Sequence, residues 1–475
     1  MDYGMLLNGV WCETGAIREV RSPYDSSLVG RVAEAKPEHV AEATSIAMQT
    51  MKDPIPAYQR AEILESVAKL LKQRAEDFSK TLVLEAGKPI KAARAEVERA
   101  VSTLTVAASE SRSMAGEMIP MAATPAGIGK LAFTMREPIG VVGAITPFNF
   151  PLNLVCHKLA PAIAAGCAVV LKPAERTPIS AIKLAKLFLE AGLPPGWLNV
   201  LVGDGPTLGA ALVNEPNIAL ITFTGSGAVG WSIREQAPRK KVLLELGNSS
   251  PVLVFDDGDV EAAASACARN GFSFSGQSCI SVQRAIVQRG VAEEFERKFL
   301  KLVSDLVVGD PMNECTDVGP LISKRECDRI LSWIGETQKG GATILSGGHL
   351  AQETIVEPTV LSNVKPGMKV FNREIFGPVV VISRFDDIDE ALELANATEY
   401  GLQAGVYTNS LDRAIAAAGR LRFAGVLINE SPTFRADQMP YGGWKESGNT
   451  REGPKYAMME MTEPKLIVVN GFPSN

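Results

Sequence analysis

The 475-residue sequence is poor in the residues from which disulfide frameworks and metal sites are built. Its seven cysteines are odd in number and irregularly spaced, with no Cys-x-x-Cys pair, which argues against a disulfide scaffold and a cysteine-based zinc site. Only three histidines are present, so a metal site with several histidine ligands is nearly excluded. This cysteine usage suits a reducing compartment, and we expect a cytoplasmic protein without a bound metal.

Long apolar runs and a strong charge of one sign are also missing. The longest apolar stretch, Leu159–Leu171, has 13 residues, whereas a membrane-spanning helix needs about 20. The N-terminus lacks the basic and then apolar order of a signal peptide. The net charge is −6, which does not favour binding to nucleic acid or an anionic membrane. With 46% hydrophobic and 21% charged residues, the sequence is typical of a globular protein.

Hydrophobic periodicity in the first quarter of the chain predicts helices. Residues 38–114 follow a helical pattern, in which we expect one helix over residues 61–87 and a second over residues 90–114. Residues 117–137 break this pattern and are typical of a hairpin with Pro and Gly in its turn. Because exposed strands are usually paired or covered, the hairpin is a candidate arm that packs on another subunit; packing within one subunit is the alternative.

Strands and helices alternate from residue 139 to residue 272, which predicts an α/β fold. Thr177 and Pro178 indicate the start of one of these helices, with Thr as its cap and Pro in its first turn. The order predicts a parallel sheet with right-handed crossovers and helices on both faces. Ligands in such sheets bind at the carboxyl ends of the strands. A second α/β stretch follows, and we expect a domain boundary near Gly247.

Two segments at the ends of predicted strands could bind a dinucleotide. In Phe223–Gly230 the glycines have the GxGxxG spacing, and small residues before a helix let backbone N–H groups approach a pyrophosphate. The alternative is an ordinary tight turn between a strand and a helix. Lys172 and Glu175 could bind ribose hydroxyls, and the carboxylate would repel a 2′-phosphate, which favours NAD over NADP. A solvated lysine and a glutamate at a helix start are the alternative for this pair.

Three polar residues lie in surroundings that could support catalysis. Cys279 is among small and polar residues, unlike Cys167 and Cys267, and would be a nucleophile if a base or a local field lowered its pKa. Glu245 interrupts an apolar strand, where a carboxyl group tends to have a raised pKa that suits a general base. Asn149, between two prolines, could donate its amide to an oxyanion. The alternatives are an inert thiol, a structural salt bridge and a turn-forming asparagine.

Taken together and in this order, the segments resemble the motifs of the aldehyde dehydrogenase superfamily. The likeness covers nearly the whole chain and includes two late motifs, EIFGP and PYGGWKESG. An ordered set of this kind is much more specific than any one of its members. The matching segments are Thr146–Pro151, Lys172–Glu175, Phe223–Gly230, Leu244–Pro251, Gly276–Cys279, Glu374–Pro378 and Pro440–Gly448.

The resemblance implies a covalent mechanism. Cys279 would attack an aldehyde carbonyl, and the Asn149 amide and the Cys279 backbone N–H would hold the oxyanion of the thiohemiacetal. Hydride transfer to a nicotinamide would leave a thioester, and Glu245 would activate the water that hydrolyses it. The implied cofactor is NAD, because Glu175 is present, with NADP as the alternative. The residues implied to bind it are Ile145, Thr146, Phe148, Lys172, Glu175, Gly205, Phe223, Gly225, Ser226, Leu246, Glu374 and Phe376.

The substrate that the resemblance implies is a small aldehyde. Residues 429–441 and 448–463 look most like the lactaldehyde, non-phosphorylating glyceraldehyde-3-phosphate and phosphonoacetaldehyde dehydrogenases. Arg435 is then a candidate anchor for a hydroxylated or anionic aldehyde such as lactaldehyde, with a surface salt bridge as the alternative. Two departures are Asn248, where relatives commonly have a second Gly, and Ser278, where relatives with phosphorylated or carboxylated substrates often have Arg. The pocket candidates are Phe150, Asn153, Ser278 and Ile280.

The resemblance also implies a division into domains. A Rossmann-like cofactor domain would comprise residues 1–115 and 138–246, and an α/β catalytic domain would comprise residues 247–452. Residues 116–137 and 453–475 would form a small β bridging element that joins subunits into a homodimer or a homotetramer.

Two other functions stay open. One is a coenzyme A-acylating enzyme, but such relatives often lack the glutamate that Glu245 supplies here. The other is a catalytically retired NAD-binding relative, which the joint presence of Cys279, Glu245 and Asn149 argues against.

Overall fold

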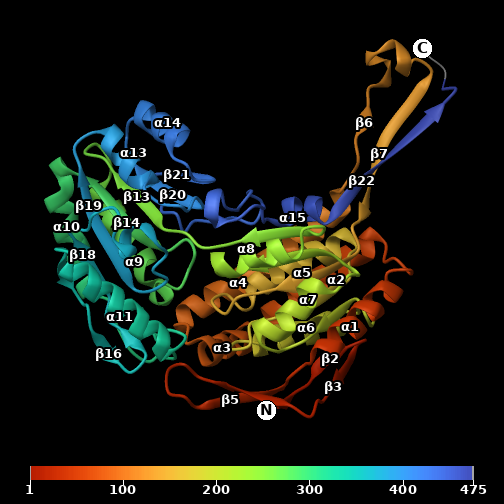
Figure 1. The fold of residues 1–475 in the computed structure, drawn as a ribbon, viewed down its shortest axis with the longest axis horizontal. Coiled ribbons are helices and arrows are strands. Elements are labelled where there is room, and N and C mark those ends of the chain that lie inside the picture. Colours follow the sequence, from red (N-terminus) through yellow and green to blue (C-terminus); the bar gives the residue numbers. More distant parts are fainter. Residues whose placement is uncertain (1, 473–475) are drawn as a thin grey trace.

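The computed structural model describes residues 2–472 and shows two halves, each built on a sheet, and a projecting β-arm (Figure 1). Each half contains a seven-stranded sheet covered by helices, so the predicted α/β class is confirmed. The limits of the three predicted domains stay a prediction. Residue 1, assigned above to the cofactor domain, and residues 473–475, assigned to the bridging element, lie outside the described residues.

The first sheet has five parallel strands and two antiparallel strands at one edge. Its order is β12-β11-β8-β9-β10-β2-β3, in which β2 and β3 come from the N-terminus. The parallel strands are short apolar runs that are buried on both faces, because helices cover the sheet on each side. The strands are β2 (Met5–Leu7), β3 (Val10–Cys12), β8 (Val141–Ile145), β9 (Val169–Lys172), β10 (Leu198–Val200), β11 (Ile218–Thr224) and β12 (Lys241–Glu245).

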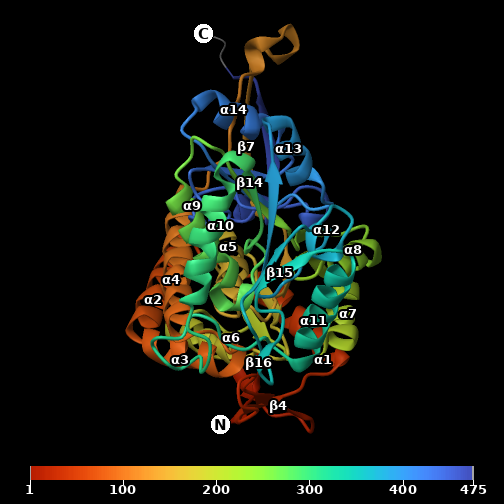
Figure 2. The ribbon, with the colours of Figure 1, turned by 90° about the vertical axis from the view of Figure 1, so that its left-hand side faces the viewer.

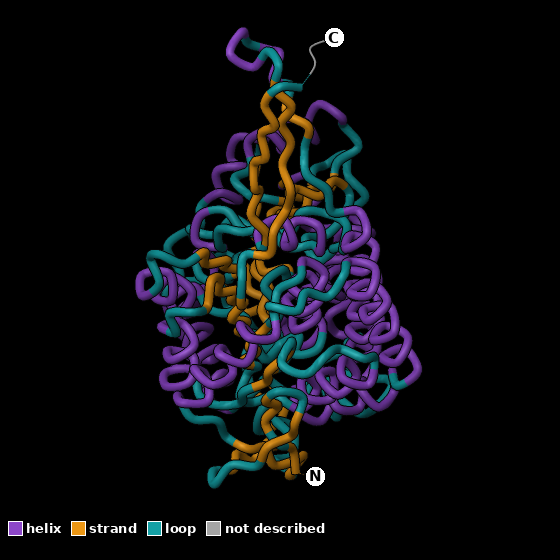
Figure 3. The backbone as a smooth tube through the Cα atoms, turned by 90° about the vertical axis from the view of Figure 1, so that its right-hand side faces the viewer, coloured by secondary structure: helices purple, strands orange, loops and turns teal. Residues whose placement is uncertain are grey.

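Helices flank the strands on both sides, as Figure 3 shows. One group contains α2, α4, α5 and α6, with α3 packed against α4 and α6, and a second contains α1, α7 and α8. The helices are α1 (Pro37–Thr50), α2 (Ala57–Gln73), α3 (Ala75–Ala86), α4 (Ile90–Ser113), α5 (Asn153–Ala165), α6 (Ile179–Glu190), α7 (Ala210–Asn214) and α8 (Gly227–Gln236).

The single helix predicted over residues 61–87 is wrong, because the segment forms two helices. α2 ends at Gln73 and α3 begins at Ala75, and Arg74 between them has φ −106° and ψ 20°, outside the helical range. Both helices turn their apolar side chains inward, so the apolar pattern continues across the break. The predicted end at Gly87 is confirmed, since this residue has a φ of 68°, which favours glycine.

Thr177 does not cap the helix that follows it, which corrects a second prediction. Its hydroxyl donates to the Phe148 carbonyl at 3.5 Å, and α6 begins only at Ile179. The N–H groups of Ile179 and Ser180 donate to the buried Glu85 carboxylate at 2.7 and 3.0 Å. Glu85, 94 residues before Ile179 in the chain, therefore supplies the cap.

The second sheet belongs to the C-terminal half of the chain. Its order is β15-β18-β19-β14-β13-β20-β21, and every adjacent pair is parallel except β15 with β18. Helices α9, α10, α11, α13 and α14 lie around this sheet (Figure 2). Buried apolar clusters lie beneath α9 and α10, beneath α11, and beneath α13 and α14. The elements are β13 (Ser250–Val254), α9 (Val260–Phe272), β14 (Val282–Gln288), α10 (Arg289–Ser304), α11 (Lys324–Lys339), β15 (Thr343–Ser346), β18 (Thr359–Ser362), β19 (Val379–Phe385), α13 (Ile388–Asn396), β20 (Gln403–Tyr407), α14 (Leu411–Arg420) and β21 (Gly425–Ile428).

The arm is a three-stranded antiparallel sheet that extends from the body of the molecule (Figure 1). β6 (Met118–Ile119) pairs with β7 (Lys130–Pro138), which confirms the predicted hairpin, and β7 pairs along its length with β22 (Thr462–Asn470). None of the described helices is both long and apolar enough to cross a bilayer. The remaining short elements are β1 (Asp2–Tyr3), β4 (Ile17–Arg21), β5 (Leu28–Ala33), β16 (Leu350–Gln352), β17 (Ile355–Val356), α12 (Lys369–Asn372) and α15 (Pro454–Glu460).

Candidate active site

A cleft of about 550 Å³ lies at the carboxyl ends of β8, β9, β11 and β12, and residues of both halves line it. Asn149 and Cys279 lie on its wall together with all the residues predicted to bind a dinucleotide. Those residues are Ile145, Thr146, Phe148, Lys172, Glu175, Gly205, Phe223, Gly225, Ser226, Leu246, Glu374 and Phe376. The residues of this set that end or follow strands of the first sheet lie where the rule for parallel sheets predicts, whereas Glu374 and Phe376 come from the loop before β19.

The wall of this cleft has the features that a dinucleotide requires. Gly225 and Ser226 line it directly before α8, and the N-terminus of a helix favours a phosphate group. Lys172 and Glu175 face each other at 3.6 Å and offer a donor and an acceptor for ribose hydroxyls. The Thr146 hydroxyl is buried and has no hydrogen-bond partner among the described residues. An unpartnered polar atom on the wall fits a site built for a polar ligand.

Glu374 lies on the opposite wall of the cleft. Its Oε1 accepts a hydrogen bond from the Asn248 backbone N–H at 3.1 Å, and burial raises the pKa of the Glu374 carboxyl to about 7. The Asn248 side chain itself donates to the Ser250 hydroxyl at 2.8 Å and the Gln403 carbonyl at 3.3 Å. The asparagine that departs from the family motif thus holds neighbouring strands together through its side chain.

The loop before Cys279 has an unusual backbone. Phe274, Ser275 and Gly276 all have positive φ angles of 48°, 55° and 67°. A Cβ atom at Gly276 would lie 2.1 Å from the Gly377 carbonyl oxygen, so only glycine fits there. The loop that bears Cys279 therefore packs backbone against backbone on the loop that bears Glu374.

Cys279 is partly exposed, and its Sγ lies 3.2 Å from the Tyr441 hydroxyl. Burial raises the pKa of the Cys279 thiol to about 12, and the charges of Glu374 and Glu245 act in the same direction. The Tyr441 hydrogen bond and the Arg435 charge oppose this rise in pKa. Cys279 is more exposed than Cys167 and Cys267, which are fully buried, as their apolar surroundings in the sequence indicated.

Asn149 is tied to the nucleophile loop. Its Nδ2 donates to the Gln277 carbonyl at 3.0 Å, two residues before Cys279. Because an amide nitrogen carries two hydrogens, one N–H remains for a further acceptor. The arrangement places an amide donor and a thiol on the wall of one cleft, which is the pair that an acyl-transfer site needs.

Glu245 ends β12 and is buried beside the cleft. Both carboxyl oxygens lack a hydrogen-bond partner among the described residues. Burial raises the pKa of Glu245 well above its ordinary value, and Glu452 adds to the rise, whereas Arg435 and Lys158 oppose it. A buried carboxyl group with unpartnered oxygens and a high proton affinity can take a proton from a water molecule that reaches it.

The model of the aldehyde dehydrogenase family matches residues 11–467. The chain belongs to the aldehyde dehydrogenase family. It is 46% identical over 469 residues to the 3-sulfolactaldehyde dehydrogenase of Priestia aryabhattai, covering 99% of this chain and 98% of that protein.

Two solved structures of family members are similar over almost their whole length. The NAD-dependent aldehyde dehydrogenase of Sinorhizobium meliloti has a TM-score of 0.96 and 35% identity, with 100% of this chain and 96% of that chain covered. The glyceraldehyde-3-phosphate dehydrogenase GapN of Methanocaldococcus jannaschii, complexed with NADP, has a TM-score of 0.92 and 38% identity, with 97% and 100% covered. The predicted resemblance and the oxidoreductase class are confirmed.

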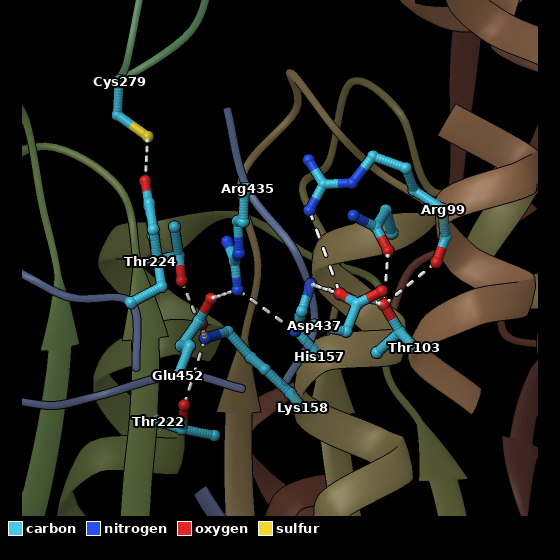
Figure 4. A network of polar contacts seen from close by, with 12 residues as sticks. Arg99, Thr103, His157, Lys158, Thr222, Thr224, Cys279, Arg435, Asp437 and Glu452 are labelled. Carbon is cyan, nitrogen blue, oxygen red and sulfur yellow. Dashed lines mark hydrogen bonds and ion pairs between the residues drawn. The ribbon is translucent and has the colours of Figure 1, made fainter. Parts of the chain in front are cut away.

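Arg435 is not on the surface, which corrects the salt-bridge alternative for this aldehyde dehydrogenase. Its side chain is only 4% exposed, and its guanidinium pairs with the buried Glu452 carboxylate at 2.9 Å. It also donates to Nδ1 of His157 at 3.2 Å (Figure 4). The guanidinium lies 3.8 Å from the centre of the Tyr441 ring. The Arg435 charge is thus already neutralised by Glu452.

The other substrate candidates do not line the cleft either. The Asn153 side-chain oxygen accepts from the Thr103 hydroxyl at 3.1 Å. Ile280 packs beneath the site against Tyr441. Ser278 borders a small separate cavity behind the nucleophile loop. Glu374 and Phe376, two of the residues predicted to bind the dinucleotide, line the same small cavity as Ser278. Contact of the candidate residues with a substrate stays a prediction.

Sequence reasoning missed the buried charges that support the site. Lys88 and Glu96 form an ion pair whose side chains are both 0% exposed. The Lys88 ammonium lies 3.8 Å from the centre of the Phe150 ring and 4.4 Å from that of Phe274. The Glu96 carboxylate accepts from the backbone N–H groups of residues 152 and 153. Nothing in the sequence predicts that a lysine and a glutamate eight residues apart are buried. Only the structure therefore reveals this ion pair.

Polar residues at the start of α11 were also missed. Ser323, Arg325, Glu326 and Arg329 line the cleft opposite the first sheet. Arg329 donates to the Ile375 carbonyl at 2.6 Å and so joins α11 to the loop that bears Glu374. Among residues 2–472, no three His, Cys, Asp or Glu side chains are arranged to hold a metal ion.

Proposed function

We propose that this protein oxidises a small aldehyde to its carboxylate through a covalent intermediate on Cys279, with NAD or NADP as hydride acceptor. The observation that carries the proposal is the shared cleft: the thiol, the Asn149 amide and the residues suited to a dinucleotide all line it. The Sinorhizobium relative is named as NAD-dependent, and the Methanocaldococcus relative is complexed with NADP.

The first step forms a bond between the Cys279 sulfur and the aldehyde carbon. The carbonyl π electrons move to the oxygen, where the Asn149 amide and the Cys279 backbone N–H stabilise the negative charge. One such donor is typically worth about 3 kcal/mol in the transition state. Because burial raises the pKa of Cys279 to about 12, the resting group is a thiol. It first gives its proton to a water molecule in the cleft, which passes the proton to solvent, and the thiolate then attacks.

A dinucleotide, when bound, supplies the acceptor for the hydride that leaves the tetrahedral carbon. The chain's own residues would hold it: Lys172 and Glu175 would bind the adenosine ribose, Ser226 the pyrophosphate and Glu374 the nicotinamide ribose. We propose NAD as the preferred form, because the Glu175 carboxylate accepts from a free 2′-hydroxyl and repels a 2′-phosphate.

Hydrolysis of the thioester completes the reaction. Glu245 takes a proton from water while the water oxygen bonds to the acyl carbon, and the carbon–sulfur bond then breaks. The products are a carboxylic acid, which ionises, and the Cys279 thiolate. The two unpartnered oxygens of Glu245 support this role, because a base needs a free lone pair.

The substrate that we propose is a hydroxylated or anionic small aldehyde, as the name of the Priestia relative suggests. Arg435 is poorly suited as its anchor, because Glu452 already pairs with it. Arg99 on α4 is better suited, since its Nη2 is buried without a hydrogen-bond partner and lies 3.9 Å from Asp437. An anionic group there would partner a guanidinium that the protein leaves only weakly paired.

We further propose that the arm joins subunits into a dimer or a tetramer. Met135 on β7 and Leu466 and Val468 on β22 are exposed apolar side chains on its surface. Exposed apolar side chains that gather on one element mark a surface for contact with another protein, so a partner that covers these side chains would stabilise the arm.

The test is the Cys279→Ser variant with a panel of hydroxylated, phosphonate-bearing, sulfonated and aromatic aldehydes. We expect it to form no NADH with any aldehyde while its NAD affinity changes less than about twofold. Normal turnover by the variant would refute the nucleophile assignment. If the native protein forms a carboxylate without coenzyme A, the thioester is hydrolysed by water and the acylating alternative is excluded. If the native protein oxidises none of the aldehydes in the panel, the result favours a retired NAD-binding protein.

A further inference from the structure

We infer that Tyr441 is a further catalytic residue, whose hydroxyl donates a hydrogen bond to the Cys279 sulfur once the thiol has ionised. The inference rests on the proposed role of Cys279 as nucleophile. Its basis is the 3.2 Å contact between the Tyr441 hydroxyl and the Cys279 sulfur, in a chain that has no histidine near Cys279 in its sequence.

The backbone of Tyr441 is held firmly in place. Its N–H donates to the Glu452 carbonyl at 3.0 Å, and its carbonyl accepts from the Glu452 N–H at 2.5 Å. The side chain is buried, with 3% of the residue exposed. The hydroxyl therefore reaches the sulfur from a fixed support and loses little conformational freedom when the hydrogen bond forms.

A chain of buried charges holds a cation against the Tyr441 ring. The Arg435 guanidinium lies 3.8 Å from the centre of the ring and pairs with Glu452. Glu452 in turn lies 3.5 Å from the Lys158 ammonium, which donates to the hydroxyls of two threonines on β11 (Figure 4). A fixed positive charge beside a phenol strengthens its O–H as a donor. Arg435 is then a positioning residue that acts through Tyr441, instead of a substrate anchor.

The direction of the hydrogen bond follows from the state of the sulfur. A thiol can donate to the Tyr441 oxygen, but a thiolate can only accept, so the O–H must turn toward it. The tyrosine keeps its proton throughout. The same donor serves twice, because the thiolate that attacks the aldehyde is also the group expelled when the thioester is hydrolysed.

Several groups around the thiol act on the pKa of Cys279, and the Tyr441 hydroxyl is one of them. Burial is the main cause of the raised pKa of Cys279, the Tyr441 hydrogen bond opposes it, Glu374 and Glu245 add to the rise, and Arg435 lowers the pKa. The Tyr441 hydroxyl is the neutral donor among these groups. Because a hydrogen bond to a charged acceptor is stronger than one between neutral groups, its removal should raise the thiol pKa by about one unit.

The experiment compares Tyr441→Phe with Tyr407→Phe, which removes a second buried tyrosine hydroxyl in the apolar cluster beneath α9 and α10. Iodoacetamide alkylation of residue 279 is followed by peptide mass from pH 7 to pH 10, with Cys279→Ser as the background for the other cysteines. Below the thiol pKa the rate follows the thiolate fraction, so Tyr441→Phe should react about tenfold more slowly at each pH.

The pH profile of kcat/KM with the best aldehyde should move to higher pH by the same amount in Tyr441→Phe and should not move in Tyr407→Phe. Equal alkylation rates for the native protein and Tyr441→Phe, with unchanged thermal midpoints, would overturn the inference. Alkylation is measured without an aldehyde, so it tests the hydrogen bond from Tyr441 to the Cys279 sulfur separately from the reaction. The proposed function can therefore fail, with Cys279→Ser retaining turnover, while this measurement still has a clear outcome.

Discussion

Replacing Lys88 with methionine removes one partner of a fully buried ion pair. The ammonium lies between two phenyl rings and pairs with Glu96, and both side chains are 0% exposed. Methionine fills a similar volume but leaves the Glu96 carboxylate buried without its cation, a change that costs about 3–5 kcal/mol. Since Glu96 keeps hydrogen bonds from two backbone N–H groups, we expect the free energy of unfolding to fall by about 3 kcal/mol, the low end of this range.

Thermal unfolding at equal protein concentration measures this loss. The matched control is Lys91→Met, because Lys91 pairs with Asp317 on the surface, where its side chain is 47% exposed and the pair is worth less than about 1 kcal/mol. The double variant Lys88→Met/Glu96→Gln should regain part of the loss, because a neutral glutamine still accepts from a backbone N–H. Equal midpoints for Lys88→Met and Lys91→Met, or a double variant less stable than the single one, would refute the reasoning.

Two further predictions concern the reaction. Glu245→Gln should slow thioester hydrolysis by between about 10² and 10⁴-fold but hydride transfer much less, so a burst of NADH should precede a slow steady state. Stopped-flow absorbance checks this, and an absent burst counts against the base role. Glu175→Ala should raise the ratio of kcat/KM for NADP to that for NAD by about tenfold, equivalent to about 1.4 kcal/mol, because a 2′-phosphate no longer meets a carboxylate. An unchanged ratio contradicts the ribose assignment.

The location of the site was predictable because it depends on where parallel strands end. Thr146, Lys172, Ser226 and Leu246 each follow a strand that the apolar pattern identifies, and the structure brings all four to one cleft. The break at Arg74 was not predictable, since the apolar face continues through it.

Partners that are distant in the sequence account for the other differences. The cap of α6 comes from Glu85, so no local pattern around Thr177 could show it. Arg435 resembles a surface cation in the sequence, but it meets Glu452, 17 residues away, only after the C-terminal segment has folded against α5. Burial and pairing of charges depend on tertiary packing, which a single sequence does not reveal.

The close approach of Gly276 to Gly377 has a consequence for the evolution of specificity. The two main chains leave no space for a methyl group between them, so the loop that bears Glu374, which we propose to bind the ribose, and the loop that bears the sulfur should move together. A substitution that shifts Glu374 to suit another coenzyme should therefore displace the reactive thiol as well. Changes of coenzyme and changes of aldehyde are expected to be acquired together, or else at residues such as Glu175 that lie outside this joined pair of loops.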